Sequence, residues 1–332
     1  MGWKGTLRSI NAAAKRADRN AKRRQKELLK DQIAYEKMQE LEKAAYEVDV
    51  FENHIDVIQS IHKDCGDIVD WLKISISQEP VKPPIVNHNE RQAIARLNSF
   101  VPSLIDKLLG KTISKRQQLE KDISIAKVKD TQINNANLSQ WHNDVEEWKE
   151  RVSLARRLLN GDISSKIDII KELNPFSEID YLGSGVNFTI RENGLLIVTI
   201  NVHGADIIPK EQKTLLKSGK LSIKPMPISR FNEIYQDYVC SVILRVANEI
   251  FSILPDDKML INAEDHLLNK STGHLEQQSL LSVYITRDGI SKLNMEYVDP
   301  SDAMNNFIHN VNFKKTKGFE PVDEVKTPEV NI

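Results

Sequence analysis

The sequence predicts an α+β protein in which a long helical region, forming a coiled coil or a helical hairpin, precedes a compact α+β domain. In the first half of the chain, apolar residues recur at alternating steps of three and four, the spacing of a helix that buries one stripe. After Pro175 the pattern changes to short apolar runs separated by turn residues, which is typical of strands. We expect these strands to form a mixed or antiparallel sheet packed on one long helix.

Breaks in this pattern divide the chain into five predicted parts. The breaks are marked by proline, which cannot continue a helix, and by composition. Pro102 is expected to kink a helix that starts near Glu90. The parts are a long basic-to-acidic helix (1–77), a proline-rich linker (78–89), a returning helical region (90–173), an α+β domain (174–320) and a flexible tail (321–332).

Three apolar stripes carry the coiled-coil prediction. Each stripe needs a partner, and the sequence leaves open whether that partner is the same chain or a second copy, so we expect a homo-oligomer. Trp141 and Trp148 are expected to anchor the packing, with stacking on nucleic-acid bases as the alternative. The stripes are Trp3, Leu7, Ile10, Ala14, Ala17 and Ala21; Leu41, Ala44, Val48, Phe51, Ile55 and Ile58; and Trp141, Val145, Trp148, Val152, Ala155 and Leu159.

The α+β domain is expected to contain one long helix among short strands. Ser229 is placed to cap the start of this helix, and Pro255 ends it. The resulting order β-β-β-α-β-β differs from the regular alternation of a Rossmann domain. The expected elements are strands at 186–191, 195–203 and 221–224, a helix at 230–254, and strands at 259–263 and 280–285.

Basic residues are concentrated in two segments. Residues 1–30 contain ten Lys and Arg but only two acidic residues, a net charge of +8. Such a concentration favours an anionic partner, although a charge run is often only a solvated face. In the second segment, steps of four and three place Lys213, Lys217 and Lys220 on one face of a helix. The candidate nucleic-acid or anion-binding residues are Arg16, Arg19, Lys22, Arg23, Arg24, Lys213, Lys217, Lys220, Lys224 and Arg230.

Acidic residues and histidines gather near the last predicted hairpin. Asp265, His266, His274 and Glu276 face one another if this hairpin is tight, and they are then candidate metal ligands. Polar residues in a solvated loop explain the same group.

A wider set of residues supports an enzyme hypothesis. It resembles the layout of the PD-(D/E)xK-type nucleases, which hold Mg²⁺ with acidic residues from a helix and from adjacent strands. The sequence departs from that layout because Gln278 stands where the lysine belongs and no proline precedes Asp265. The candidate catalytic residues under this resemblance are Glu233, Asp237, Asp265, Glu276 and Gln278.

These observations favour a non-enzymatic scaffold or adaptor that needs no cofactor. It self-associates through a coiled coil and binds nucleic acid or an acidic partner through its basic N-terminal arm. The alternative is a nuclease-like enzyme that uses Mg²⁺. Two cysteines without metal or disulfide spacing, together with the lack of any long apolar run, predict a cytoplasmic protein. A membrane surface is a less favoured partner, and no small-molecule substrate is evident.

Replacing Arg16, Arg19, Arg23 and Arg24 with Gln tests the basic arm. If the arm contacts phosphates, nucleic-acid affinity falls and the salt dependence flattens by about 0.9 log units per lost charge. Anisotropy of a labelled duplex over a salt series measures both effects. If acidic residues of a neighbouring copy neutralise the arm instead, light scattering shows a loss of oligomeric state while nucleic-acid affinity is negligible in both proteins. No change in either assay contradicts both accounts.

Overall fold

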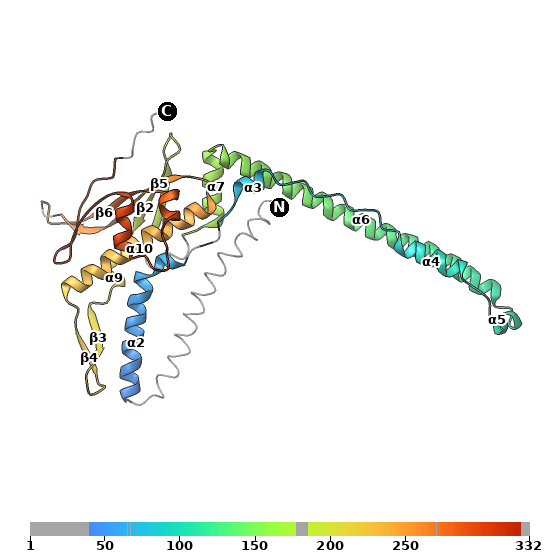
Figure 1. Cartoon of the computed structure of the whole chain (residues 1–332), viewed down its shortest axis with the longest axis horizontal. Coiled ribbons are helices and arrows are strands. Elements are labelled where there is room, and N and C mark those ends of the chain that lie inside the picture. Colours follow the sequence, from blue (N-terminus) through green and yellow to red (C-terminus); the bar gives the residue numbers. More distant parts are fainter. Residues whose placement is uncertain (1–39, 65, 67, 177–184, 270, 327–332) are drawn as a thin grey trace. The chain divides into compact units, whose positions relative to one another are not determined.

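The chain folds into two compact units (Figure 1). The computed structural model describes residues 40–64, 66, 68–176, 185–269 and 271–326. One unit, the arm, comprises residues 72–155, and the other, the compact domain, contains the described residues of 7–71 and 156–332. This division differs from the predicted one, because the end of the first helical region and residues 156–173 belong to the compact domain.

The arm is built on the longest described helix, α6 (Thr112–Leu159), which has 48 residues and is about 72 Å long at 1.5 Å per residue. It lies within the predicted returning helical region, and its polar first half is helical throughout. The single kinked helix expected from Glu90 is instead two helices that leave Pro102 between them. These are α4 (His88–Asn98) and α5 (Leu104–Leu108), preceded by α3 (Trp71–Ser75).

The predicted proline-rich linker is an extended strap, residues 77–87, that lies along α6 (Figure 1). Trp148 Nε1 donates a hydrogen bond to the carbonyl oxygen of Ser77 (3.1 Å), and Trp141 Nε1 donates to that of Pro80 (2.9 Å). Both tryptophans are half-buried. The apolar stripe of α6 therefore meets an extended segment of its own chain at these positions.

Asp130 of α6 fixes the start of α4. Its carboxylate accepts hydrogen bonds from the backbone N–H of Glu90 (2.8 Å) and from the side-chain amide of Asn89 (2.7 Å). These contacts satisfy donors that the helix itself leaves open, because the N-cap residue Asn87 makes no side-chain cap hydrogen bond. A side chain distant in sequence therefore caps α4.

The compact domain contains a mixed six-stranded sheet in the order β1-β2-β5-β6-β7-β8. Strands β2 and β5 are parallel, and the other neighbouring pairs are antiparallel. A separate two-stranded sheet is formed by β3 (Glu211–Leu215) and β4 (Leu221–Pro225). The six strands are β1 (Gly185–Ile190), β2 (Leu196–Asn201), β5 (Lys258–Leu268), β6 (Leu275–Thr286), β7 (Ile308–Lys314) and β8 (Gly318–Glu320).

Helix α10 (Ile228–Ile253) connects the parallel strands β2 and β5 through the intervening ribbon and packs on the sheet. It starts directly after Pro227 and has no side-chain cap, so Ser229 is not the N-cap that the sequence predicted. The remaining elements are α2 (Glu40–Gln59), η1 (Ile61–Lys63), α7 (Ile163–Leu173), α9 (Gly204–Ile207), α11 (Arg287–Ser291), α12 (Pro300–Ala303) and η2 (Met304–Asn306).

The second apolar stripe is buried inside the compact domain. Helix α2 contacts α10, β3 and β4. The stripe is therefore covered by the same chain, which was one of the two possibilities that the sequence left open. Its buried members are Ala44, Val48, Phe51, Ile55 and Ile58.

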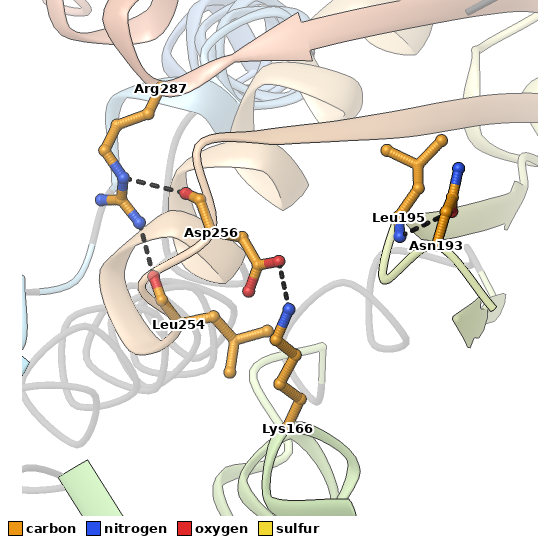
Figure 2. A network of polar contacts seen from close by, with 6 residues as sticks. All are labelled: Lys166, Asn193, Leu195, Leu254, Asp256 and Arg287. Atoms are coloured by element: carbon orange, nitrogen blue, oxygen red, sulfur yellow. Dashed lines mark hydrogen bonds and ion pairs between the residues drawn. The ribbon is translucent and has the colours of Figure 1, made fainter. Parts of the chain in front are cut away.

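Four successive backbone carbonyls at the end of α10 accept hydrogen bonds from outside the helix. Such carbonyls have no partner within a helix and are costly to bury without one. The donors come from Val69, from Trp71 at the start of α3, and from Arg287, the first residue after β6. Figure 2 shows the contact between Arg287 and Leu254. The pairs are Arg287 Nη1 to Phe251 (2.8 Å), the Val69 N–H to Ser252 (2.8 Å), Trp71 Nε1 to Ile253 (2.8 Å) and Arg287 Nη2 to Leu254.

A buried ion pair lies beside this helix end (Figure 2). Lys166 Nζ is 2.6 Å from Asp256 Oδ1, and the two side chains are only 7% and 9% exposed. Arg287 Nε also donates to the Asp256 carbonyl oxygen (2.9 Å). Lys166 belongs to α7, which is capped by Asp162, because its carboxylate accepts a hydrogen bond from the Ser165 N–H at 3.0 Å. The pair thus ties α7 to the loop that follows α10.

Replacing Arg287 with Met should lower the free energy of unfolding by about 2–4 kcal/mol, because buried carbonyls lose their donors. Arg191→Met is the matched control. That arginine forms an exposed ion pair with Glu324, so its loss should cost less than about 1 kcal/mol. Urea denaturation measures both changes, and equal losses in the two variants would contradict this role for Arg287.

Candidate functional site

The two-stranded sheet is the centre of a basic segment, residues 210–230, which we call the ribbon. The segment leads into α10 and includes the first three residues of that helix. Residues 216–220 connect its strands, and Gly219 has a φ of +80°, which favours glycine. Six basic residues and one acidic residue give the segment a net charge of +5. The expectation that Lys213, Lys217 and Lys220 share a helical face is wrong. The first lies on β3, and the other two lie in the turn.

The ribbon is attached to α2 on one side. Lys213 Nζ is 3.0 Å from a carboxylate oxygen of Glu47, so one of the six positive charges is paired within the chain. On β4, Lys224 lies opposite Gln212, whereas Lys213 lies opposite Ile223, so these two lysines stand on different faces of the ribbon. The exposed basic side chains are Lys210, Lys217, Lys220, Lys224 and Arg230.

The remaining predicted anion-binding residues belong to the basic N-terminal segment, residues 1–30, which is distinct from the arm at 72–155. Arg16, Arg19, Lys22, Arg23 and Arg24 lie outside the described residues, as does the first apolar stripe. The structure therefore places only the ribbon half of this candidate set.

The helix residues of the enzyme hypothesis line a polar cleft. Glu233 and Asp237 of α10 face a cavity of about 660 Å³ together with residues near α12 and β7. Sequence analysis missed the other polar residues of the cleft, because they come from short segments whose spacing carries no motif. These include Gln59, Asp299, Ser301, Asp302, His309 and Lys315.

The charges in this cleft are partly compensated. Lys315 forms an ion pair with Glu233, which raises the pKa of the lysine. Gln59 donates a hydrogen bond to Asp237 (2.7 Å). Burial nevertheless raises the pKa of Asp237, against the lowering effect of that bond and of one from Ser301. For Asp299, burial acts in the same direction, but backbone N–H groups at the start of α12 outweigh it and lower the pKa. The cleft thus shifts the pKa values of two of its carboxyl groups in opposite directions.

The strand residues of the enzyme and metal hypotheses are committed to separate contacts. Asp265 of β5 accepts a hydrogen bond from the hydroxyl of Tyr235 on α10. Burial, together with this carboxylate, raises the pKa of Tyr235 above its usual value. Gln278 lies opposite Asp265 in the β5–β6 ladder, as a hairpin requires, whereas Glu276 lies opposite Leu267.

Glu276 is held by the loop between β5 and β6. Its carboxylate accepts hydrogen bonds from Asn269 (2.8 Å) and Thr272 (2.6 Å), which lower its pKa. His266 lies opposite Gln277 on the ladder, and His274 lies in the loop. Among the described residues, no three His, Cys, Asp or Glu side chains are grouped so that they can hold a metal ion. The predicted convergence of Asp265, His266, His274 and Glu276 is therefore not seen.

In comparisons with known proteins, no family model, no curated protein and no solved structure matched the chain. None of the described helices has the length and apolar character needed to cross a membrane.

Replacing Asp237 with Asn should change how stability depends on pH. A carboxyl group whose pKa is raised by folding destabilises the protein as pH rises above its usual value of 3.8. The variant lacks this penalty, so its melting temperature should exceed that of the wild type at neutral pH, with the gap closing as pH falls toward 3.8. Thermal melts across this pH range measure the gap. A difference that is independent of pH would mean that the Asp237 charge is not responsible.

Proposed function

We propose that this chain is a non-enzymatic adaptor that binds nucleic acid through the exposed lysines of its basic ribbon and through its basic N-terminal arm. The ribbon is the observation that carries the proposal. Four exposed lysines lie on or beside the small sheet, whose strands contact α2, and the exposed Arg230 follows at the start of α10. Clustered surface cations of this kind bind phosphates by releasing condensed counterions.

The shape of the ribbon suits this partner. A two-stranded β-ribbon fits the major groove of B-form DNA. Among the exposed basic residues, Lys217 and Lys220 lie in the turn, Lys224 lies on β4, and Lys210 and Arg230 lie at the opposite end of the ribbon. This spread along the ribbon offers contacts to successive phosphates of a DNA backbone. The ribbon also carries Leu215, Leu216 and Ile223, and each of these side chains is about half exposed. Because lysine contacts with phosphate carry no sequence information, we expect binding with little base preference.

Self-association is the second part of the proposal, and it now rests on one of the three apolar stripes. Apart from the exposed Leu41, the stripe at 41–58 is buried within the compact domain. The stripe at 141–159 meets the strap at Trp141 and Trp148. The alanine-rich stripe at 3–21 is then the segment that needs a partner helix. We propose that the coiled coil forms there, between copies of the chain.

The nuclease-like alternative has less support. It requires Asp265 and Glu276 to share one cation with an acidic residue of α10. Asp265 is bound to Tyr235, and Glu276 is bound to Asn269 and Thr272. No observation among the described residues favours this alternative over the adaptor.

Replacing Lys217, Lys220 and Lys224 with Gln tests the ribbon. Affinity for a labelled duplex should fall, and the slope of log affinity against log salt should flatten by about 0.9 per lysine. The control variant replaces Lys121, Lys127 and Lys129, three exposed lysines of α6, and makes the same change in net charge. Anisotropy over a salt series measures both. The ribbon proposal fails if the two variants lose affinity equally or if the wild type does not bind.

A further inference from the structure

The arm exposes a concentrated group of aliphatic side chains where the chain turns from α4 through α5 into α6. Leu104 is 84% exposed and Leu108 is 90% exposed, although both lie on a helix. A contiguous apolar surface of this kind marks an interaction site more often than a solvated one. We call residues 100–116 the tip. Its exposed aliphatic residues are Val101, Leu104, Ile105, Leu108, Leu109 and Ile113.

Within α5 the usual arrangement is reversed, with the acid inside and the leucines outside. Asp106, the buried residue of this helix, is 7% exposed and forms an ion pair with Lys115 of α6 at 2.5 Å. Asp106 and Ser103 also form a reciprocal capping box, in which each side chain accepts a hydrogen bond from the backbone N–H of the other. The polar contacts therefore hold α5 in place with its aliphatic side chains directed outward.

Basic residues surround this apolar surface. Residues 100–116 contain Lys107, Lys111, Lys115 and Arg116 against the single acid Asp106, a net charge of +3. Lys115 is paired with Asp106 and Arg116 with Glu120, so Lys107 and Lys111 are the cations that the tip presents to its surroundings. Lysine near an apolar surface can extend its ammonium group outward while its methylene chain remains in apolar contact.

We propose that the tip binds the surface of a lipid bilayer that contains anionic headgroups. Its aliphatic side chains enter the boundary of the acyl chains, and Lys107 and Lys111 contact the headgroups. The charge of the tip argues against a second copy as the partner, since two tips of +3 repel each other. A hydrocarbon layer also accepts an apolar surface of any shape. A protein groove would have to match leucines that cover adjacent sides of a five-residue helix.

This inference is independent of the nucleic-acid proposal, and it revises the low rank that a membrane surface had as a partner. Leu104 and Leu108 continue the helical spacing of Leu97 and Val101, so the sequence alone does not mark these two leucines as exposed.

Cosedimentation of the full chain with vesicles tests the inference. Vesicles of phosphatidylcholine with one quarter phosphatidylserine should bind the wild type, and vesicles of phosphatidylcholine alone should bind it about tenfold less. The variant Leu104→Ser/Leu108→Ser should lose about tenfold or more in binding to the anionic vesicles, because two apolar insertions are lost. The variant Lys107→Gln/Lys111→Gln should lose binding to the anionic vesicles but not to the neutral ones.

The control variant is Ile125→Ser/Val128→Ser. These side chains are also exposed on α6, at 63% and 57%, but they lie outside the tip, so vesicle binding should not change. Circular dichroism should show the same helix content in all variants.

Three results would overturn the inference: no sedimentation of the wild type with anionic vesicles, equal binding by the tip variant and the control, or loss of binding only when the arginines of the N-terminal arm are replaced. Duplex anisotropy of the tip variant should match the wild type, which separates this test from that of the ribbon.

Discussion

The C-terminal end of α10 is the junction on which the compact domain depends. A buried helix end leaves carbonyl oxygens that cost about 1–3 kcal/mol each when they lack a donor. Here Arg287 supplies two donors, and Val69 and Trp71 supply one each. Val69 and Trp71 at the start of α3, the α10–β5 loop and the residue after β6 therefore all meet at one place. This requirement explains why residues before the arm belong to the same unit as the sheet, although more than 80 residues of the arm separate them.

With its far end fixed, α10 positions both candidate surfaces at its beginning. The ribbon leads directly into the helix, and its attachment to Glu47 of α2 orients it. The polar cleft lies along the first turns of the same helix, where Glu233 and Asp237 emerge. Arg230 belongs to both surfaces, because it is one of the exposed cations next to the ribbon and also lines the cleft. A basic surface and a mostly acidic one thus adjoin at one helix terminus.

The sequence was most informative where local chemistry decides the structure. The strands on either side of Gly194, the cap at Asp162 and the long apolar helix before Pro255 all follow from turn, capping and periodicity signals. It was least informative where distant groups decide. Lys213 and Lys217 have helical spacing, but β3 forms because its residues pair with β4 and pack on α2.

The strap and the candidate site show the same limit. The strap is held by hydrogen bonds with Trp141, Trp148 and Asn134, and its own residues show no apolar periodicity that would predict these contacts. Glu276 was expected to face the other candidate ligands, but Asn269 and Thr272 hold its carboxylate within the loop. Sequence spacing alone does not show which of several polar neighbours will form hydrogen bonds with a given side chain.

The strap gives the arm a mechanical character that differs from that of the compact domain. Each anchoring contact joins the strap or α4 to the part of α6 directly beside it, as Asp130 does for Asn89 and Glu90. Stability is then approximately a sum of local contributions along one axis, as in repeat proteins. Opening at one level does not require opening at the next. Such an arm can fray and re-form from its turn inward while the compact domain stays folded.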